Sequence, residues 1–376
     1  MKTHSPDVPA PVAGLLLCLC ISCPAPGLTI QFNYDYDTPG FFNPAVNPNA
    51  AQARATLENA GRNYEMFTDS LLPIVPGGGD TWTAGFTNPA TGDGVFLPGL
   101  VVPADTMIVF VGARNLGSTV LGEGGPGNRS VSGTPDWVNT VLARGQAGAL
   151  LDPRQDFGPW GGSITFGKDI TWNYDLASGP AGGQNDFFST CLHELAHVLG
   201  FGTTGSWTRL VQSGNHTFLG PASESLYGGP VPLYGDNAHW ASGTQGLSGG
   251  QVQQAEMTPS ITIATRKRLT TLDLAGLVDL GWQMPVTGDA NLDGAVDAAD
   301  YVTLKRDFTG PPAATWTEGD FDFDGAVTWR DLSALAANFG SGLPAQPAQL
   351  PEPTTLALLA AGCLAIRRRR KKGLSS

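Results

Sequence analysis

A metal-binding pattern lies near the middle of the 376-residue sequence. His193, Glu194 and His197 form an H-E-x-x-H motif inside a segment whose apolar spacing predicts a helix. Residues four apart share one face of a helix, so both imidazoles can bind one zinc ion. Glu194 then stands beside the metal, where its carboxylate can take the proton of a zinc-activated water. The motif therefore predicts one catalytic Zn²⁺ and hydrolytic chemistry.

The sequence offers several residues for the third protein ligand. A shorter form of the motif would carry a histidine three residues after Gly200, but Thr203 occupies that position. His216 and His239 are the other histidines beyond the N-terminal segment, and Glu224 would supply a carboxylate in a different arrangement. The residues by themselves leave the choice between His216, His239 and Glu224 open.

The pattern H-E-x-x-H-x-x-G resembles that of the metzincin zinc peptidases. In that family a glycine turns the chain after the second histidine, and a methionine-containing turn follows the third ligand. Residues 256–259 (EMTP) resemble this Met-turn, and His239 precedes them after a long insertion, as in the leishmanolysin-like branch. The resemblance covers about residues 185–282. It implies His239 as the third zinc ligand and Met257 beneath the metal.

The same resemblance implies an α+β fold in which a twisted mixed sheet lies beside the active-site helix. Residues 162–166 (GSITF) resemble the edge strand that lines the substrate cleft in this family. A polypeptide substrate would bind along such a strand in extended form. The implied reaction is hydrolysis of a peptide bond by zinc-activated water, with Glu194 as the general base.

Several elements can be predicted around the motif. Asn185 or Asp186 is a suitable N-cap for the motif helix, and Gly200 is a suitable end. The other predicted elements are a strand at residues 29–36, an amphipathic helix at 50–72, a buried strand at 106–112, a Gly-rich loop at 117–133 and a helix at 271–281.

Two acidic segments beyond residue 286 repeat the ligand spacing of a calcium-binding loop. Each has oxygen-bearing side chains at positions 1, 3, 5 and 12, a backbone carbonyl at position 7 and the turn glycine at position 6. The predicted ligands are Asp289, Asn291, Asp293, Ala295 and Asp300 in the first loop, and Asp320, Asp322, Asp324, Ala326 and Asp331 in the second. Clustered carboxylates repel one another without a cation, so we expect two Ca²⁺ ions.

One short helix is predicted after each loop and none before it, and this duplication resembles a type I dockerin. The resemblance implies a small all-α calcium-binding domain at residues 286–340 and a cohesin-domain protein as partner. Positions 10 and 11 differ between the loops, Ala298-Ala299 against Trp329-Arg330, whereas symmetric dockerins repeat one pair. A role limited to stabilising or spacing the protein is therefore the alternative.

Both ends of the chain carry targeting patterns. Residues 1–27 contain a ten-residue apolar run at 12–21, too short to span a bilayer, and predict a secretory signal peptide. Residues 351–376 combine Pro-Glu-Pro, an apolar stretch and a basic cluster, which resembles the PEP-CTERM signal read by exosortase-type sorting machinery. A weak tail anchor is the alternative, and residues 341–350 are predicted to be a linker. These patterns imply secretion or display on a bacterial cell surface or outer envelope.

The net charge of −12 argues against nucleic acid as a partner. Six of the 21 Lys and Arg residues lie together at 367–372, so the rest of the chain is still more acidic. Between the two terminal segments Cys191 is the only cysteine, which excludes a disulfide framework there and suits a core position.

The sequence thus predicts a metallopeptidase domain at residues 28–285, followed by the calcium-binding domain. The leading interpretation is a secreted or surface-sorted zinc endopeptidase. The alternative is a non-catalytic surface-binding protein, in which a degenerate peptidase scaffold carries a dockerin-like domain that docks to a cohesin. Zinc binding and the role of Glu194 distinguish the two.

Overall fold

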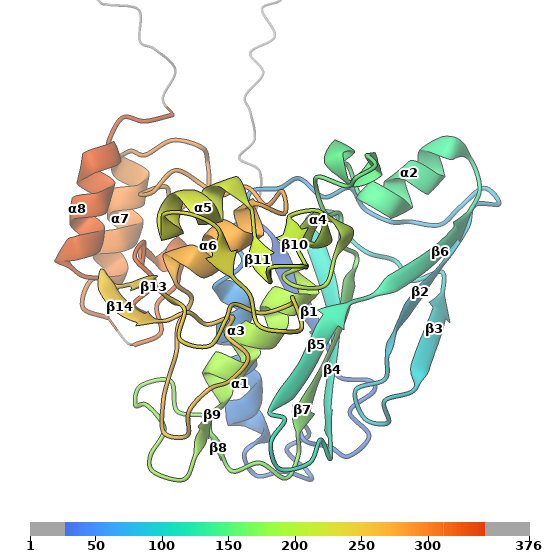
Figure 1. The fold of residues 1–376 in the computed structure, drawn as a ribbon, viewed down its shortest axis with the longest axis horizontal. Coiled ribbons are helices and arrows are strands. Elements are labelled where there is room, and N and C mark those ends of the chain that lie inside the picture. The colour runs from blue at the N-terminus through green and yellow to red at the C-terminus, as the bar shows by residue number, and fades with distance from the viewer. Residues whose placement is uncertain (1–26, 311, 343–376) are drawn as a thin grey trace, which may run out of the picture.

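The computed structural model describes residues 27–310 and 312–342 as a mixed α+β structure of several small sheets and helices (Figure 1). This confirms the predicted α+β class. The predicted signal peptide up to residue 26, the linker beyond residue 342 and the C-terminal sorting signal lie outside the described residues. Within the described ranges, no helix is both long and apolar enough to cross a membrane.

The largest sheet has four strands in the order β1-β4-β7-β5. Strands β1 (Thr29–Asn33), β4 (Thr106–Arg114) and β7 (Gly161–Gly167) are parallel, and β5 (Gly122–Pro126) runs antiparallel to β7 at the edge. β7 is buried along its whole length and β4 along all but its last residue, as expected for strands that are covered on both faces. The three strands predicted in this sheet are confirmed, although β1 is shorter than predicted.

Two predictions about this sheet are wrong. Residues 117–133, predicted as a loop, contain β5 and β6 (Asn128–Ser132). The β5 sequence GEGGP lacks the alternation and the β-branched residues that mark a strand, and it is a strand because its backbone pairs with β7. The predicted edge strand, β7, has neighbours on both sides, so β5 is the edge strand instead.

The two faces of the main sheet bury different cores. On β4, Met107 and Val109 belong to the core shared with α1 (Ala50–Arg62) and α3 (Phe187–Val198). Ile108 and Phe110 alternate with them and pack on the opposite face. That face is covered by the sheet β3-β2-β6 and by α2. The bounds of the elements not yet given are β2 (Thr81–Thr87), β3 (Gly94–Pro98) and α2 (Pro135–Ala143). Figure 1 shows α1 and α3 on one side of the sheet and β2 and β3 on the other.

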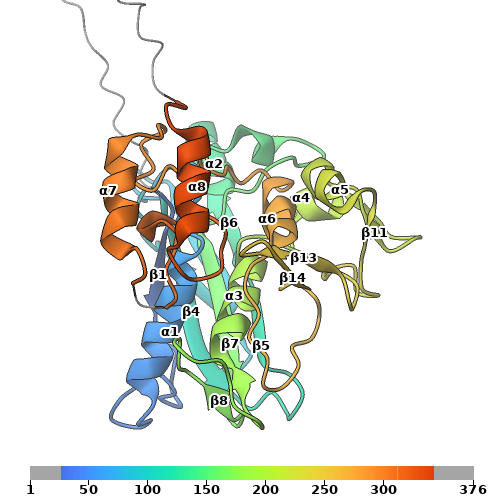
Figure 2. The same cartoon turned by 90° about the vertical axis from the view of Figure 1, so that its left-hand side faces the viewer.

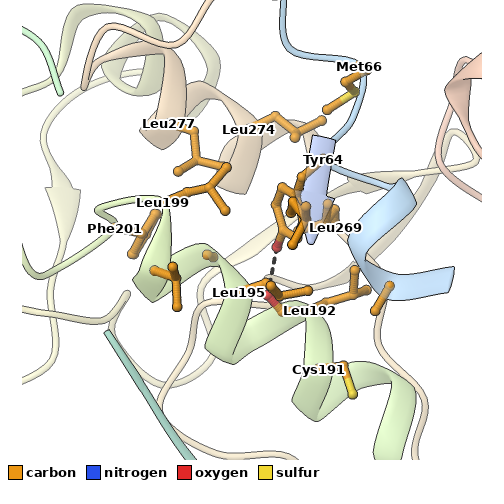
Figure 3. Close-up of a cluster of buried hydrophobic side chains, with 14 of the residues drawn as sticks. Tyr64, Met66, Cys191, Leu192, Leu195, Leu199, Phe201, Leu269, Leu274 and Leu277 are labelled. Atoms are coloured by element: carbon orange, nitrogen blue, oxygen red, sulfur yellow. Dashed lines mark hydrogen bonds between the residues drawn. The ribbon is translucent and has the colours of Figure 1, made fainter. Parts of the chain in front are cut away.

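Helix α3 is anchored in the first core by one apolar face. Leu192, Leu195 and Leu199 lie on this face and are buried together with Tyr64 (Figure 3). The Tyr64 hydroxyl donates a hydrogen bond of 2.6 Å to the Leu192 carbonyl oxygen. The opposite face of α3 is thereby turned toward β5, with which the helix makes extensive contact.

Helix α1 ends at Arg62, ten residues before the predicted end at Leu72. The apolar residues that continued the predicted face, Phe67 and Leu71, are nonetheless buried. Their backbone groups bond to other parts of the fold: the Phe67 carbonyl accepts from the Leu28 N–H, and the Leu71 N–H donates to the Asp105 carboxylate. The apolar spacing extends beyond the helix because these side chains are still buried in the core. The helix itself ends earlier, since the backbone groups of these residues bond to distant parts of the fold.

The segment between α3 and the calcium loops folds into short elements around the end of α3. They are α4 (Gly205–Thr208), α5 (Pro221–Tyr227), α6 (Thr271–Val278), the sheet of β10 (Val211–Gln212), β11 (Thr217–Phe218) and β12 (Val231–Pro232), and the hairpin of β13 (Gln245–Ser248) and β14 (Gln251–Gln254). The paired strands β8 (Trp172–Asn173) and β9 (Asn185–Asp186) lie before α3 in the chain. Helix α6 confirms the helix predicted at 271–281, with an earlier end.

The calcium-loop region contains two helices that lie side by side, α7 (Ala298–Asp307) and α8 (Trp329–Asn338) (Figure 2). Its buried residues, among them Leu292, Phe323 and Leu335, belong to the same hydrophobic cluster as α1 and α3. The Asn59 amide of α1 also donates to the Ala313 carbonyl at 2.9 Å. The module is therefore packed against the rest of the protein.

The contact between β5 and α3 depends on glycine, and substitutions of two adjacent glycines test it. A Cβ on Gly124 would lie 2.4 Å from the Glu194 backbone oxygen, whereas a Cβ on Gly125 would have no atom within 4 Å. We expect Gly124→Ala to lower the free energy of unfolding by about 1–3 kcal/mol because strand and helix must separate. Gly125→Ala is the matched control and should change it by less than about 0.5 kcal/mol. Urea unfolding measures both, and equal shifts would contradict this packing.

Candidate metal centres

Helix α3 carries the H-E-x-x-H motif, and both of its ends are fixed. The Asp186 side chain accepts a hydrogen bond of 3.1 Å from the Ser189 N–H and is paired with Arg266 at 2.8 Å. Asp186 is thus the predicted N-cap. At the other end Gly200 adopts a φ of +108°, which disfavours any side chain, and turns the chain away from the helix.

The three imidazoles of His193, His197 and His239 converge on one point. The Nε2 atoms are 3.2 Å apart between His193 and His197, 3.0 Å between His197 and His239, and 3.1 Å between His193 and His239. Two nitrogens bound to one tetrahedral zinc ion lie roughly 3.3 Å apart. The triangle therefore fits three ligands of one zinc ion and leaves a fourth position for water or substrate.

The outer nitrogen of each ring faces a hydrogen-bond acceptor. Nδ1 of His193 donates to the Glu256 carbonyl at 3.1 Å, and Nδ1 of His197 donates to the Phe201 carbonyl at 2.8 Å. Nδ1 of His239 donates to the Asp236 carboxylate at 2.8 Å. Because each Nδ1 holds the ring proton, each Nε2 presents its lone pair to the centre, which is the arrangement of a metal site with its outer-sphere acceptors.

Burial favours the neutral, metal-binding form of the His193 and His197 rings. Burial, together with the neighbouring imidazoles, lowers the pKa of His193 well below its ordinary value. Burial, together with His239, lowers the pKa of His197 to about 4. Neutral rings with converging lone pairs repel one another unless a cation lies between them, so the geometry fits a metal ion better than a hydrogen-bonded cluster.

Glu194 is buried between α3 and the edge strand β5. A Cβ on Gly122 would lie 2.8 Å from the Glu194 carboxylate, so the strand can approach this closely only because it has glycine there. Burial raises the pKa of Glu194 to about 8, and the charge of Glu123 adds to the effect. A divalent cation on the adjacent imidazoles would favour the carboxylate and lower this pKa again. The side chain is thus placed to exchange a proton with a molecule at the triad.

His239 reaches the motif helix because Gly202 lets two segments of backbone approach each other closely. Gly202 has a φ of +72°, and a Cβ on it would lie 2.2 Å from the Ala238 carbonyl oxygen. The residue after Ala238 is His239, so this contact brings the third imidazole to the other two. Thr203, at the position of the absent histidine, donates its hydroxyl to the His197 carbonyl at 3.0 Å and so satisfies the end of α3.

The two other candidate ligands lie elsewhere. His216 is in the turn between β10 and β11, and its Nδ1 lies 2.8 Å from the Asn237 side-chain oxygen. Glu224 is on α5. Within residues 27–310 and 312–342, neither belongs to a group of side chains that could hold a metal ion. Cys191 is buried in the core as predicted, and burial raises the pKa of its thiol.

The turn that contains Met257 is organised by one buried carboxylate, Asp273. Its oxygens accept hydrogen bonds from the N–H groups of Glu256 (2.9 Å) and Met257 (3.1 Å) and from the Trp240 indole (3.0 Å). Asp273 also closes the N-terminal capping box of α6 with Thr270. Met257 is fully buried, and its carbonyl accepts from the Trp240 N–H at 2.9 Å. The predicted Met-turn is therefore bonded to the residue that follows His239.

A cleft of about 590 Å³ opens in front of the triad. Residues 118–124, which include the start of β5, form one wall, and residues 258–263, which follow the Met-turn, form the other. His193, Glu194, His197 and His239 lie on its floor. The cleft therefore combines an open approach to the triad with the free edge of a strand.

The two calcium loops have the same internal geometry. In each loop the residue at position 1 accepts from the N–H of the position-6 glycine: Asp289 from Gly294 at 2.9 Å, and Asp320 from Gly325 at 2.8 Å. The residues at position 12 accept from the N–H at position 2, both at 2.8 Å: Asp300 from Ala290, and Asp331 from Phe321. Gly294 and Gly325 have φ values of +85° and +80°. The residues at positions 1, 6 and 12 are thus held in the same way in both loops.

The second loop brings three carboxylates together and leaves one of them, that of Asp322, without a hydrogen-bond partner among the described residues. Asp320, Asp322 and Asp331 place oxygen atoms within 4.8 Å of one another. Both oxygens of Asp322 are buried and have no hydrogen-bond partner among the described residues. Burial and the neighbouring carboxylates raise the pKa of Asp322 to about 6 and that of Asp320 well above its ordinary value. Such a cluster fits a calcium ion, which would supply the missing partner of Asp322.

Residues 287–339 match the family model of the Dockerin type I domain. The match confirms the dockerin-like domain predicted from the two loops, and dockerin domains bind calcium. The comparison with curated proteins and the comparison with solved structures found no match. The metzincin-like interpretation of the preceding residues and that of the C-terminal sorting signal remain predictions.

Sequence reasoning missed the residues that support the triad. Asp236 accepts the hydrogen bond from Nδ1 of His239. It lies three residues before His239, and this spacing could have indicated its role. Asp273, Gly122 and Gly202 act through contacts across long stretches of the chain, and no local pattern marks them. The edge strand itself was hidden by its glycine content.

Replacement of Asp236 tests the assignment of the triad. Asp236→Asn keeps the shape of the side chain but removes the charge that favours the Nδ1 proton of His239, so we expect zinc affinity to fall about 10-fold. His216→Ala is the control, since this imidazole lies outside the triad and should leave zinc affinity unchanged. Competition with a chromophoric zinc chelator measures both affinities. A loss of zinc in His216→Ala alone would show that the triad has been wrongly assigned.

Proposed function

We propose that this chain is an extracellular or cell-surface protein in which a zinc-dependent endopeptidase domain, residues 28–285, is joined to a dockerin domain that docks to a cohesin-domain partner. The docking part is supported by the family match at residues 287–339. The peptidase part rests on one observation: three imidazoles whose Nε2 atoms lie within 3.2 Å of one another, next to a buried carboxyl group and open to a cleft.

The chemistry follows from this set of residues. A zinc ion held by the three imidazoles would act as a Lewis acid toward a carbonyl group and would lower the pKa of a water molecule to about 7. Glu194 is the adjacent residue that can accept the proton of the attacking water and return it to the leaving amine. Asp236 and the carbonyl groups of Glu256 and Phe201 keep the imidazoles in the required tautomer.

The substrate class is suggested by the wall of the cleft. In the described sheet β5 has a strand neighbour on one side only, and its first residues line the cleft beside Glu194. An extended polypeptide can add to such an edge as a further strand, which would bring a peptide bond to the triad. This supports hydrolysis of polypeptides over other zinc-dependent hydrolyses.

A second candidate function needs no catalysis. The dockerin domain is supported by a family match and the peptidase domain is not, so the chain could serve as a surface-binding protein on a degenerate peptidase scaffold. In that case Glu194 would have no role beyond packing. Sorting by an exosortase-type system remains part of the proposal and concerns residues outside those described.

Zinc content and activity of two variants test the peptidase proposal. The purified chain should hold one zinc ion and cleave an unfolded protein substrate. Glu194→Ala should keep the zinc ion and lose at least about 100-fold in kcat, because only the proton acceptor is removed. His239→Ala should lose the zinc ion. A chain that binds no zinc, or whose zinc site and activity are indifferent to Glu194→Ala, would favour the non-catalytic protein.

Binding to immobilised type I cohesins tests the docking proposal. We expect binding in calcium and loss of binding when calcium is removed, because the loops position the helices that follow them. Asp331→Asn should weaken binding, and Asp169→Asn is a control that makes the same charge change at an exposed site outside the loops. Biolayer interferometry against a panel of cohesins measures this, and the absence of any calcium-dependent binding would refute the proposal.

A further inference from the structure

The second calcium loop is bonded directly to the hairpin formed by β13 and β14. The Gly249 N–H donates a hydrogen bond of 2.7 Å to the Asp322 carbonyl oxygen. The Ser248 hydroxyl donates a hydrogen bond of 2.8 Å to the Phe323 carbonyl oxygen. Asp322 and Phe323 are positions 3 and 4 of the loop. The hairpin is therefore hydrogen-bonded to the backbone of residues whose position a bound calcium ion would fix.

Side chains and glycines on both sides make this contact close. A Cβ on Gly249, which has a φ of +58°, would lie 2.5 Å from the Asp324 Cβ. On the loop, a Cβ on Gly325 would lie 2.1 Å from an Nη atom of Arg268. The charges of Asp320 and Asp324 act on Arg268 and oppose the lowering of its pKa by burial. The interface is therefore both tight and charged.

The hairpin leads within two residues to the zinc triad. β14 ends at Gln254, and the Glu256 carbonyl accepts the ring proton of His193 at 3.1 Å. The next carbonyl, that of Met257, accepts from the N–H of Trp240, the residue after His239. The His193 imidazole is thus oriented directly by residues 255–257, which continue the hairpin, and the backbone that follows His239 bonds to the same residues.

The hairpin has little support of its own. Its side chains Leu247 and Val252 are exposed to 45% and 63%, and a two-stranded hairpin is only marginally stable without further packing. One support is α6, where Gly246 lies against Thr270. Further supports are the Gln253 side chain, which donates to the Arg268 carbonyl, and the second calcium loop.

We propose that calcium in the second dockerin loop stabilises the β13–β14 hairpin and thereby the outer-sphere hydrogen bonds of the zinc triad. Without calcium, the carboxylates of Asp320, Asp322 and Asp331 repel one another, and the loop backbone moves away from Ser248 and Gly249. Among the described residues, no hydrogen bond joins the first loop to the hairpin. The coupling is thus specific to one of two similar loops, and it rests on the proposed zinc centre.

The two loops supply a matched pair of variants in the full-length chain. Asp331→Asn and Asp300→Asn remove the same charge at position 12 of the second and the first loop. Calcium is removed by dialysis before zinc is added, and zinc affinity is measured by chelator competition. We expect saturating calcium to raise zinc affinity at least about fivefold and to slow hydrogen exchange in residues 245–258. Asp331→Asn should abolish both effects, and Asp300→Asn should keep them.

Two further variants protect the test against misfolding. Asp322→Ala removes a carboxylate that makes no hydrogen bond among the described residues and should behave like Asp331→Asn. Ser248→Ala should keep calcium binding to both loops but reduce the effect of calcium on zinc. A full-sized calcium effect in Ser248→Ala would overturn the route through the hairpin.

The readouts separate this inference from the proposed function. Equal behaviour of the two position-12 variants, or zinc affinity and exchange that do not respond to calcium, would overturn the coupling. If the chain binds no zinc, the proposed peptidase fails, and hydrogen exchange still decides whether the second loop controls the hairpin.

Discussion

Three imidazole nitrogens lie 3.0 to 3.2 Å apart with their lone pairs directed at one another. Neutral acceptors that converge in this way repel one another, so the arrangement fits a shared cation, which the three rings could bind only if every outer ring nitrogen keeps its proton. The surrounding structure meets that condition with two backbone carbonyls and the Asp236 carboxylate. The turn of the chain after α3, the hydrogen bonds of Asp273 and the path of the hairpin all support these three acceptors.

Close backbone approach is the means by which distant segments reach the triad. Gly122 and Gly124 let β5 lie directly on Glu194, and Gly202 lets the His239 segment lie against the end of α3. At each position a Cβ would lie within 2.8 Å of another atom, so any side chain would force the segments apart. The high glycine content therefore has a specific role around the site, beyond making the chain rich in loops.

The dockerin domain is more than an attachment at the end of the chain. Its buried residues join the hydrophobic cluster that also anchors α1 and α3, and its second loop bonds to the hairpin beside the zinc triad. The second calcium loop and the histidine triad are therefore both bonded to the same stretch of chain, residues 248–256. Because calcium binding couples to the folding of such a loop, we expect the hairpin that is bonded to it to respond to calcium as well.

Features that depend on local spacing could be predicted from the amino-acid sequence. The helix of the H-E-x-x-H motif, its start at Asn185 or Asp186 and both calcium loops follow from residues that lie close together in the chain. Tertiary structure decided the rest. The early end of α1, the edge position of β5 and the meeting of His239 with the other imidazoles depend on backbone groups far apart in the chain. Local sequence patterns do not predict these long-range contacts. The contacts are formed by glycine backbones and single buried carboxylates, which produce no periodic pattern in the sequence.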